Sequence, residues 1–330
     1  MIKLIVIDLD GTLLNSQHQL SDRTAEAIEK AQAQGIQIML ATGKTHHSGE
    51  AIIKRFNLTT HGIYLQGASV HLHDGGIHAN NTLNPDVARR IITFAEDRGF
   101  DVAAYSGQRI LSRTVSAGAE ELHSLYHEPM PEAVGPLQNI LASTPINKLL
   151  VIKPNEARKI KALRWQLSMQ INPKEARMTQ ALPDMLEILP PNVSKGAALK
   201  HLLKDLGIKP EEVMALGDAE NDLEMIELAG IGVAMGNAVD LLKQAADYVV
   251  ASNDEDGIAE AIERFALKKE EAPAADTSAT PATSTADTEK PADETSTDAA
   301  ASSETGGQTE GQTAGESTAQ TASKTETKTE

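Results

Sequence analysis

The first 82 residues alternate short apolar runs with longer amphipathic ones. Runs rich in β-branched and other apolar residues, which indicate buried strands, lie at Leu4–Ile7, Ile36–Ala41 and Gly62–Leu65. Segments with helical periodicity separate them: the first is opened by Ser21 and stopped by Gly35, and the second covers about 49–56. Residues 70–72 and Ile77 flank a turn at 73–76 and predict a hairpin.

The same alternation returns in residues 186–268. Helices are expected at about 194–206 and 222–229, and strands at 213–216, 231–234 and 248–250. Strands that alternate with helices predict a parallel, doubly wound sheet of the Rossmann-like kind. We therefore predict an α/β fold in which residues 1–82 and 186–268 together build one core.

Residues 83–185 carry a different pattern. Helices are expected at about 85–98 and 156–169, a hairpin at 100–114 and a strand at 148–152. This mixture predicts an α+β cap domain that is inserted between the two halves of the core.

The composition changes abruptly near residue 269. Residues 272–330 contain no Ile, Leu, Val, Met or aromatic residue. Such a segment cannot bury enough apolar surface to offset the entropy lost on ordering, so we predict that 269–330 is a disordered, low-complexity acidic tail. It serves either as a solubilising segment or as an interaction segment whose partner the sequence does not identify.

Charge and composition exclude several classes of function. The net charge is −17, and the 13 acidic residues and 3 lysines from Glu270 onward carry −10 of it. No basic stripe of the kind that binds nucleic acid is present, and the absence of cysteine excludes thiolate metal sites and cysteine nucleophiles. The apolar run at the N-terminus is too short for a signal peptide, and no window approaches the ~18 apolar residues of a membrane span. We expect a cytoplasmic protein that does not contact membranes.

Two carboxylates end the first predicted strand. Asp8 and Asp10 lie where Gly11 lets the chain turn away, and ligands of open α/β sheets bind outside the carboxyl ends of the strands. A second acidic cluster, Asp218 and Asp222, follows the strand at 213–216. Clustered carboxylates repel one another unless a cation lies between them, and oxygen ligands without Cys or paired His suit Mg²⁺.

Two further segments complete a phosphate site. The strand at 36–41 ends in Thr42 and Gly43, which offer a hydroxyl and a backbone amide. Lys195 stands at the start of a predicted helix, where its charge opposes the helix dipole unless an anion binds there too. Mg²⁺ and Lys195 would neutralise a phosphoryl group, which a carboxylate could attack.

These motifs resemble those of a known family. The string Asp8-Leu9-Asp10-Gly11-Thr12, then Thr42-Gly43, Lys195, and Gly217-Asp218 with Asn221-Asp222 resemble, in this order, the four motifs of the haloacid dehalogenase-like (HAD) hydrolase superfamily. The segments 234–238 and 253–257 look like its Cof-like phosphatase branch, which has a large cap in the position of the insertion. The resemblance covers residues 1 to about 267.

The resemblance implies a Mg²⁺-dependent phosphatase and a role for each motif residue. Asp8 would be the nucleophile, and Asp10 would protonate the leaving group and then activate water. The metal ligands would be Asp8, the backbone carbonyl of Asp10, Asp218 and, directly or through water, Asp222. The phosphoryl group would be held by Thr42, Gly43, Lys195 and Asn221.

Two positions depart from the pattern of the branch, which usually has Arg at position 44 and Asn at position 66. Here Lys44 and Gln66 stand at these positions, and Lys44 is either a substrate contact or a solvated surface residue. The expected substrate is a small phosphorylated metabolite, with sugar phosphates foremost. A phosphomutase of the same superfamily, or a non-catalytic interaction protein that uses the acidic tail, is the alternative. A histidine metal site around His71, His73 and His78 is a weaker interpretation than the carboxylate site.

Overall fold

The computed structural model of the chain describes residues 1–74 and 76–268 (at Ala119 the backbone alone). The predicted disordered tail, 269–330, lies outside the described residues. Among the helices of the described part, none is long and apolar enough to cross a membrane.

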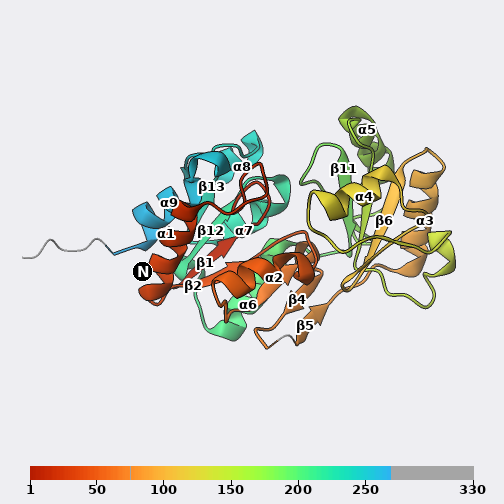
Figure 1. The fold of residues 1–330 in the computed structure, drawn as a ribbon. Coiled ribbons are helices and arrows are strands. Elements are labelled where there is room, and N and C mark those ends of the chain that lie inside the picture. Colours follow the sequence, from red (N-terminus) through yellow and green to blue (C-terminus); the bar gives the residue numbers. More distant parts are fainter. Residues whose placement is uncertain (75, 269–330) are drawn as a thin grey trace, which may run out of the picture. The chain divides into compact units, whose positions relative to one another are not determined.

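A five-stranded parallel sheet forms the core, in the order β14-β13-β12-β1-β2. Its strands are β1 (Leu4–Ile7), β2 (Gln37–Leu40), β12 (Val213–Gly217), β13 (Ile231–Ala234) and β14 (Tyr248–Val249). β1 is paired with β2 on one side and with β12 on the other. The first and last thirds of the described chain therefore share one sheet, which explains its red and green-to-blue colours in Figure 1.

Six helices accompany these strands in the described residues; the first four were predicted from the alternating pattern, and the last two were not. They are α1 (Asp22–Ala33), α2 (His46–Arg55), α6 (Lys195–Leu206), α7 (Leu223–Leu228), α8 (Asp240–Ala245) and α9 (Gly257–Ala261). From β1 the chain winds outward to β2, and from β12 it winds the opposite way to β13 and β14. Because crossovers between parallel strands are right-handed, the two directions place helices on both faces of the sheet. This is the predicted doubly wound arrangement, and α1 packs with α9 while α6 packs with α7.

The starts of α1 and α6 could be predicted from the sequence, because the side chains of their capping residues accept hydrogen bonds from backbone amides in the first turn. Ser21 Oγ accepts a hydrogen bond from Thr24 N at 3.1 Å, and α1 ends just before Gly35, whose φ of +80° suits glycine. Ser194 Oγ accepts from Ala197 N at 3.0 Å and so fixes where α6 begins. α2 is less well predicted, because it begins at His46 rather than near residue 49.

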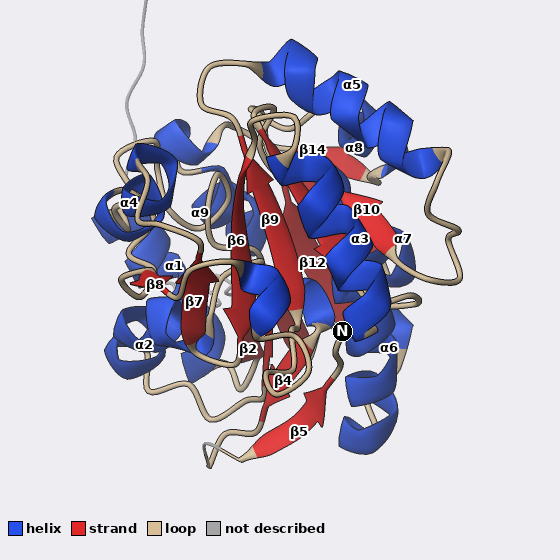
Figure 2. Ribbon diagram, turned by 90° about the vertical axis from the view of Figure 1, so that its right-hand side faces the viewer, coloured by secondary structure: helices blue, strands red, loops and turns tan. Residues whose placement is uncertain are grey.

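A second sheet, mostly antiparallel, has six strands in the order β10-β11-β9-β6-β7-β8. They are β6 (Asp101–Ser106), β7 (Arg109–Ser112), β8 (Glu132–Ala133), β9 (Lys148–Ile152), β10 (Arg177–Thr179) and β11 (Met185–Leu189). The helices of this region are α3 (Pro85–Glu96), α4 (Ala117–Ser124) and α5 (Ala157–Ser168). α3 and α5 lie on one face of the sheet, as Figure 2 shows. Their apolar residues are buried in one cluster with those of the strands. This region is the α+β insertion of the predicted fold class, which is confirmed.

Some elements of the insertion were not predicted. α4, β10 and β11 are short and lack a clear period, and β11 lies at the predicted boundary at residue 185. Because β11 pairs with β9, we propose that the insertion extends to Leu189, while the division into domains itself stays a prediction. A small antiparallel sheet of β3 (Gly62–Tyr64), β4 (Ser69–His71) and β5 (Ile77–Asn80) precedes the insertion and contains the predicted hairpin.

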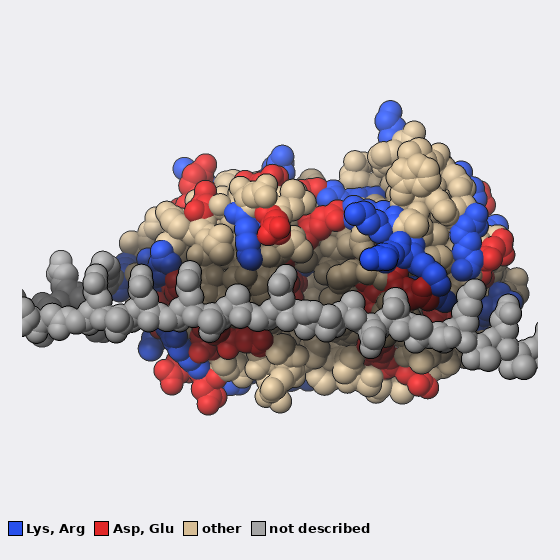
Figure 3. All heavy atoms as spheres, turned by 90° about the horizontal axis from the view of Figure 1, so that it is seen from above, with Lys and Arg blue, Asp and Glu red and all other residues tan. Residues whose placement is uncertain are grey.

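Basic and acidic side chains are interspersed on the face drawn in Figure 3, with one gathering of Lys and Arg toward the right of the view. On that face neither sign forms a continuous field of the kind that nucleic-acid binding uses.

Candidate active site

Three neighbouring strands of the core sheet deliver the predicted site residues to one edge. Asp8 follows β1, Thr42 lies two residues after β2, and Asp218 follows β12. Because β1 lies between β2 and β12 and all three are parallel, their carboxyl ends meet. The site therefore forms where the direction of winding changes, as ligand sites in open α/β sheets do.

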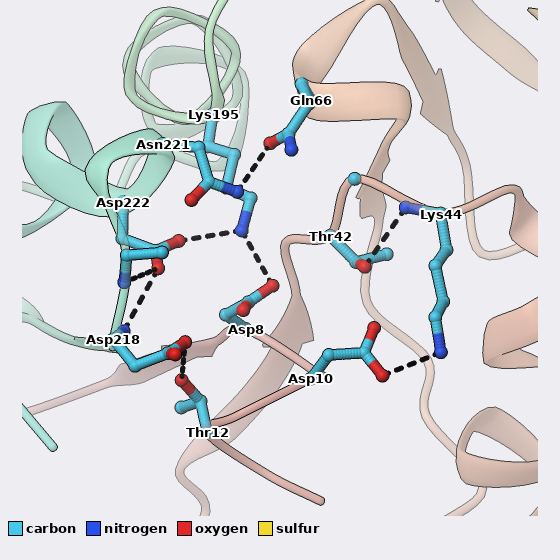
Figure 4. A network of polar contacts seen from close by, with 12 residues as sticks. Asp8, Asp10, Thr12, Thr42, Lys44, Gln66, Lys195, Asp218, Asn221 and Asp222 are labelled. Carbon is cyan, nitrogen blue, oxygen red and sulfur yellow. Dashed lines mark hydrogen bonds and ion pairs between the residues drawn. The ribbon is translucent and has the colours of Figure 1, made fainter. Parts of the chain in front are cut away.

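Lys195 joins the two acidic segments. Its Nζ donates to Asp8 Oδ1 at 2.6 Å and to Asp222 Oδ1 at 2.7 Å, and the side chain is fully buried (Figure 4). Burial opposes the charge of the ammonium, but the two carboxylates outweigh it and raise the pKa of Lys195. The lysine is therefore held as a cation beside Asp8, as phosphate binding requires.

The surroundings of the Asp8 carboxyl disfavour its ionised form. Burial raises its pKa well above the usual range, and although Lys195 opposes this, Asp222 and Asp218 add to it. The same causes act on Asp218, where burial and the charge of Asp222 raise the pKa to about 7. A cation placed among these carboxylates would relieve the repulsion.

Asp222 organises the loop after β12. Its Oδ1 accepts from Lys195, and its Oδ2 accepts from the backbone amides of Asp218 and Ala219 at 3.1 Å each. The fully buried carboxylate thus holds both the lysine and the segment that carries Asp218.

Three carboxylates satisfy the geometry of a metal site among the described residues. One oxygen from each of Asp8, Asp218 and Asp222 lies within 4.8 Å of the others. An all-carboxylate set in which the charge of Asp222 raises the pKa of Asp8 and of Asp218 fits a hard divalent cation. The side chain of Asp10 is not in this group, so its predicted part in metal binding rests on its backbone carbonyl. Thr12 supports the set, because its Oγ1 donates to Asp218 Oδ1 at 3.0 Å.

Asp10 points toward other partners. Lys44 Nζ lies 2.7 Å from its Oδ1, and His18 Nδ1 lies 3.3 Å from the same oxygen. Burial alone would raise the pKa of Asp10, but the hydrogen bond from His18 and the charge of Lys44 lower it below its usual range. Lys44 is buried, so its interpretation as a solvated surface residue is wrong.

Thr42 and Gly43 lie on the side of Asp8 opposite Asp218 and Asp222. Thr42 Oγ1 accepts from Lys44 N at 3.2 Å, which ties the loop to the residue that binds Asp10. A Cβ on Gly43 would stand 2.4 Å from Gln66 Nε2, so a larger residue there would displace the Gln66 side chain. The backbone at Gly43 is thereby exposed to the cavity.

The structure reveals a polar chain that was not predicted. Gln66 Nε2 donates to Glu187 Oε2 at 2.5 Å, and Asn221 Nδ2 donates to Gln66 Oε1 at 3.0 Å. Glu187 also accepts from Lys148 Nζ at 2.9 Å. Asn221 therefore contacts Gln66 rather than Lys195, and its own Oδ1 is buried without a protein partner. The missed signal was a charge in an apolar segment, since Lys148 begins β9 and Glu187 lies in the middle of β11.

These groups line one cavity of about 310 Å³. The core contributes Asp8, Asp10, Thr42, Gly43, Lys44, Gln66, Asp218 and Asn221, among others. The insertion contributes the opposite side, namely Tyr105, Leu122, Tyr126, Glu128, Lys148, Leu150, Ala181, Leu182, Met185 and Glu187. The cap therefore forms the side of the cavity that faces the carboxylates.

The histidines form no comparable site in the described part of the chain. His46 and His71 stack with ring centroids 4.5 Å apart, and the cluster of possible metal ligands contains carboxylates alone. The carboxylate interpretation is therefore the better supported one.

A doubly wound α/β core with an inserted α+β cap, and a buried Asp–Lys–Asp constellation at the carboxyl edge, define an enzyme site for phosphorylated substrates. Residues 5–262 match the family model of the haloacid dehalogenase-like hydrolases. The chain belongs to this family, in its Cof-like branch, and the prediction of a phosphatase is confirmed.

Three similar proteins illustrate the relation. The chain is 35% identical over 272 residues to the chloroplastic endoribonuclease YBEY of Arabidopsis thaliana, covering 80% of this chain but 46% of that protein. It is 30% identical to the 5-amino-6-(5-phospho-D-ribitylamino)uracil phosphatase YcsE of Bacillus subtilis, covering 81% of this chain and 96% of the relative. A solved HAD subclass IIB sugar phosphatase has a TM-score of 0.72 at 25% identity, covering 80% and 98% of the two chains.

Proposed function

We propose that the protein is a Mg²⁺-dependent phosphatase of small phosphate monoesters, with sugar phosphates as the main class, that acts through an aspartyl phosphate. The observation that carries this proposal is the position of Asp8. Its carboxylate lines the cavity between core and cap, 2.6 Å from the Lys195 ammonium and within the carboxylate set that fits a divalent cation.

In the first half of the reaction, the Asp8 carboxylate attacks phosphorus as the bond to the leaving oxygen breaks. Lys195, the Thr42 hydroxyl and the backbone amide of Gly43 hold the phosphoryl oxygens. Asp10 delivers a proton to the leaving oxygen. Both contacts of Asp10 with Lys44 and His18 use Oδ1, so its Oδ2 is available to the leaving group.

In the second half, Asp10 is a carboxylate and removes a proton from water. The water oxygen bonds to phosphorus, the bond to Asp8 breaks, and inorganic phosphate leaves with Asp8 restored. The pair Lys44 and His18, which lowers the pKa of Asp10, favours this carboxylate form. A Mg²⁺ ion held by Asp8, the Asp10 carbonyl, Asp218 and Asp222 would neutralise phosphoryl charge throughout.

The substrate class rests on the cavity between core and cap and on the relatives. A cavity of about 310 Å³ admits a small metabolite and not a folded protein at Asp8. The two phosphatase relatives are named for a ribityl phosphate and for sugar phosphates. The endoribonuclease relative is matched over less than half its length, so its activity supports no proposal here. A cytoplasmic location and a partner for the tail stay predictions from sequence.

The test is phosphate release from an aryl phosphate and a panel of phosphorylated metabolites, with Mg²⁺ and with a chelator. Asp8→Asn should lower turnover by about 10³-fold or more while the thermal melt stays cooperative, because the amide cannot attack phosphorus. Asp97→Asn removes an exposed carboxylate from the cap surface and should leave turnover unchanged. Full turnover by Asp8→Asn would refute the mechanism.

A further inference from the structure

The cap face that meets Asp8 is mostly apolar with one charged pair in it. Alternate residues of β6, β9 and β11 point toward the cavity, as the period of two in a strand requires. We call these cavity-lining residues the sheet wall: Tyr105, Lys148, Leu150, Met185 and Glu187. Asp8 lines the same cavity, so a substrate bound at Asp8 would place its leaving group against this wall.

Lys148, the cation of the sheet wall, is already engaged on three sides. Its Nζ donates to Glu187 Oε1 at 2.9 Å and to the backbone oxygen of Gly43 at 2.6 Å. It also lies 4.2 Å from the centroid of the Tyr105 ring. Both Lys148 and Glu187 are almost fully buried, so this ion pair is not weakened by water.

Glu187 is held just as firmly on its other oxygen. Gln66 Nε2 donates to its Oε2 at 2.5 Å, and Gln66 is in turn fixed by Asn221. The pair is therefore anchored to the core on both sides, through Gly43 and through Gln66.

The other cations of the site are paired as well. Lys44 bonds Asp10, where His18 also makes contact, and Lys195 lies between Asp8 and Asp222. The remaining charge that the cap adds to the cavity is Glu128, whose Oε2 accepts from Thr45 and Ser48. Among the described residues that line the cavity, no ammonium is left for a second anionic group.

We propose that the cavity selects phosphate monoesters whose leaving group carries no negative charge, and that the Lys148–Glu187 pair enforces this choice. The proposal rests on the proposed phosphatase function and deepens it. A carboxylate or second phosphate in the leaving group would lie beside Glu187 without a free counter-charge. It would either break the buried pair or remain unpaired in a poorly hydrated site, and both cost free energy.

The test compares substrates that differ in one oxidised terminal group. Glucose 6-phosphate is paired with 6-phosphogluconate, and glycerol 3-phosphate with 3-phosphoglycerate. The wild-type protein should show at least about tenfold higher kcat/KM for the neutral member of each pair. Equal or better turnover of the anionic member would overturn the inference.

Variants test the role of the pair. Glu187→Gln still accepts from Gln66 but no longer neutralises Lys148, so the preference for the neutral member should fall about fivefold or more. Glu132→Gln removes a carboxylate that pairs with Arg109 on the exposed side of the cap and should leave the preference unchanged. An unchanged preference in a folded Glu187→Gln protein would show that the Lys148–Glu187 pair does not cause the selection against charged leaving groups.

An assay with an aryl phosphate distinguishes failure of the proposed phosphatase function from failure of the proposed charge selection. If the wild-type protein does not hydrolyse p-nitrophenyl phosphate or any ester of the panel, the proposed function itself fails. If it hydrolyses them without regard to charge, the phosphatase stands and the charge selection is wrong. Thermal melts of each variant show whether folding was lost, and the wild-type comparison depends on no variant.

Discussion

Asp8 and Asp10 show how far two like residues can diverge once the chain is folded. They are two positions apart, yet burial raises the pKa of Asp8, while His18 and Lys44 lower that of Asp10. Besides burial, the difference comes from neighbours that lie far away in sequence: Asp222 and Asp218 raise the pKa of Asp8, and Lys44 lowers that of Asp10. The lowered pKa of Asp10 suits its second task as a base, whereas the raised pKa of Asp8 works against a nucleophilic carboxylate until a cation lies among the acidic groups.

Gly11 is a residue whose replacement should disturb the site directly. Its φ is +74°, and a Cβ there would lie 2.4 Å from Asp218 Oδ2. Gly11→Ala should therefore lower the free energy of unfolding by about 2–4 kcal/mol and reduce phosphate release, because Asp218 must shift. Urea denaturation and an aryl phosphate assay measure the two effects.

Gly35→Ala is the matched control for Gly11→Ala. Its φ is +80°, but nothing lies within 4 Å of the position of the added Cβ. It should show the backbone penalty alone, about 1 kcal/mol, with turnover unchanged. Equal losses in the two variants would contradict a specific close approach at Gly11.

At the scale of elements, strand ends and strand faces supply the chemistry. The carboxyl ends of β1, β2 and β12 carry Asp8, Thr42 and Asp218, and the alternation within β9 and β11 turns Lys148 and Glu187 toward them. The start of α2 is tied to the cap, because Glu128 accepts from the amide of Thr45 at 3.2 Å. Elements from both regions thus line the cavity together.

The contact between β4 and α2 should make stability depend on pH. Burial, with His46 stacked on the ring, lowers the pKa of His71 to about 4. The unfolded chain, with a pKa near ~6.5, therefore takes up a proton that the folded chain does not. The contribution is complete above pH ~6.5 and is lost as the pH falls toward 4, by about 2 kcal/mol at pH ~5.

His71→Gln tests this dependence by urea denaturation at pH 7 and pH 5. The variant should lose less stability than the wild type over this interval, because the neutral amide takes up no proton. His201→Gln, which changes an exposed histidine of α6, should keep the slope of the wild type. A wild-type slope in His71→Gln would show that other groups cause the acid sensitivity.

At the scale of the whole described chain, charged pairs join the cap to the core around the cavity. Arg164 of α5 binds both carboxylate oxygens of Glu220, at 2.6 and 2.7 Å, one residue before Asn221. Arg177 of β10 pairs with Glu224 of α7, which also accepts from Ser194, the capping residue of α6. The loop of Asp218 and the helix of Lys195 are both connected to the cap in this way.

Removal of residues 270–330 should leave the enzyme intact. These residues lie beyond the family match, which ends at 262, and from 272 onward they offer no large apolar side chain to a core. The shortened chain should keep its melting temperature and its kcat/KM. A loss of turnover would assign the tail a part in catalysis, whereas loss of a captured partner alone would support the interaction role.

The sequence by itself determined the class of fold and most of the site. Strand and helix periods with their capping residues predicted the core, because such signals act within a few residues. Asp8, Asp10, Thr42 and Asp218 were predicted because motifs at strand ends must meet at one edge of a parallel sheet. Lys195 was predicted because a cation at the start of a helix indicates a bound anion.

Tertiary structure alone decided which partner each group meets. The pairing of Lys148 with Glu187, the chain from Gln66 to Asn221, and the burial of Lys44 against Asp10 join residues that are 34 to 155 positions apart. No local pattern encodes such contacts, since they depend on how the cap packs over the core. For the same reason β10 and β11, whose pairing is set by the six-stranded sheet, were missed, while the helices that cap themselves were found.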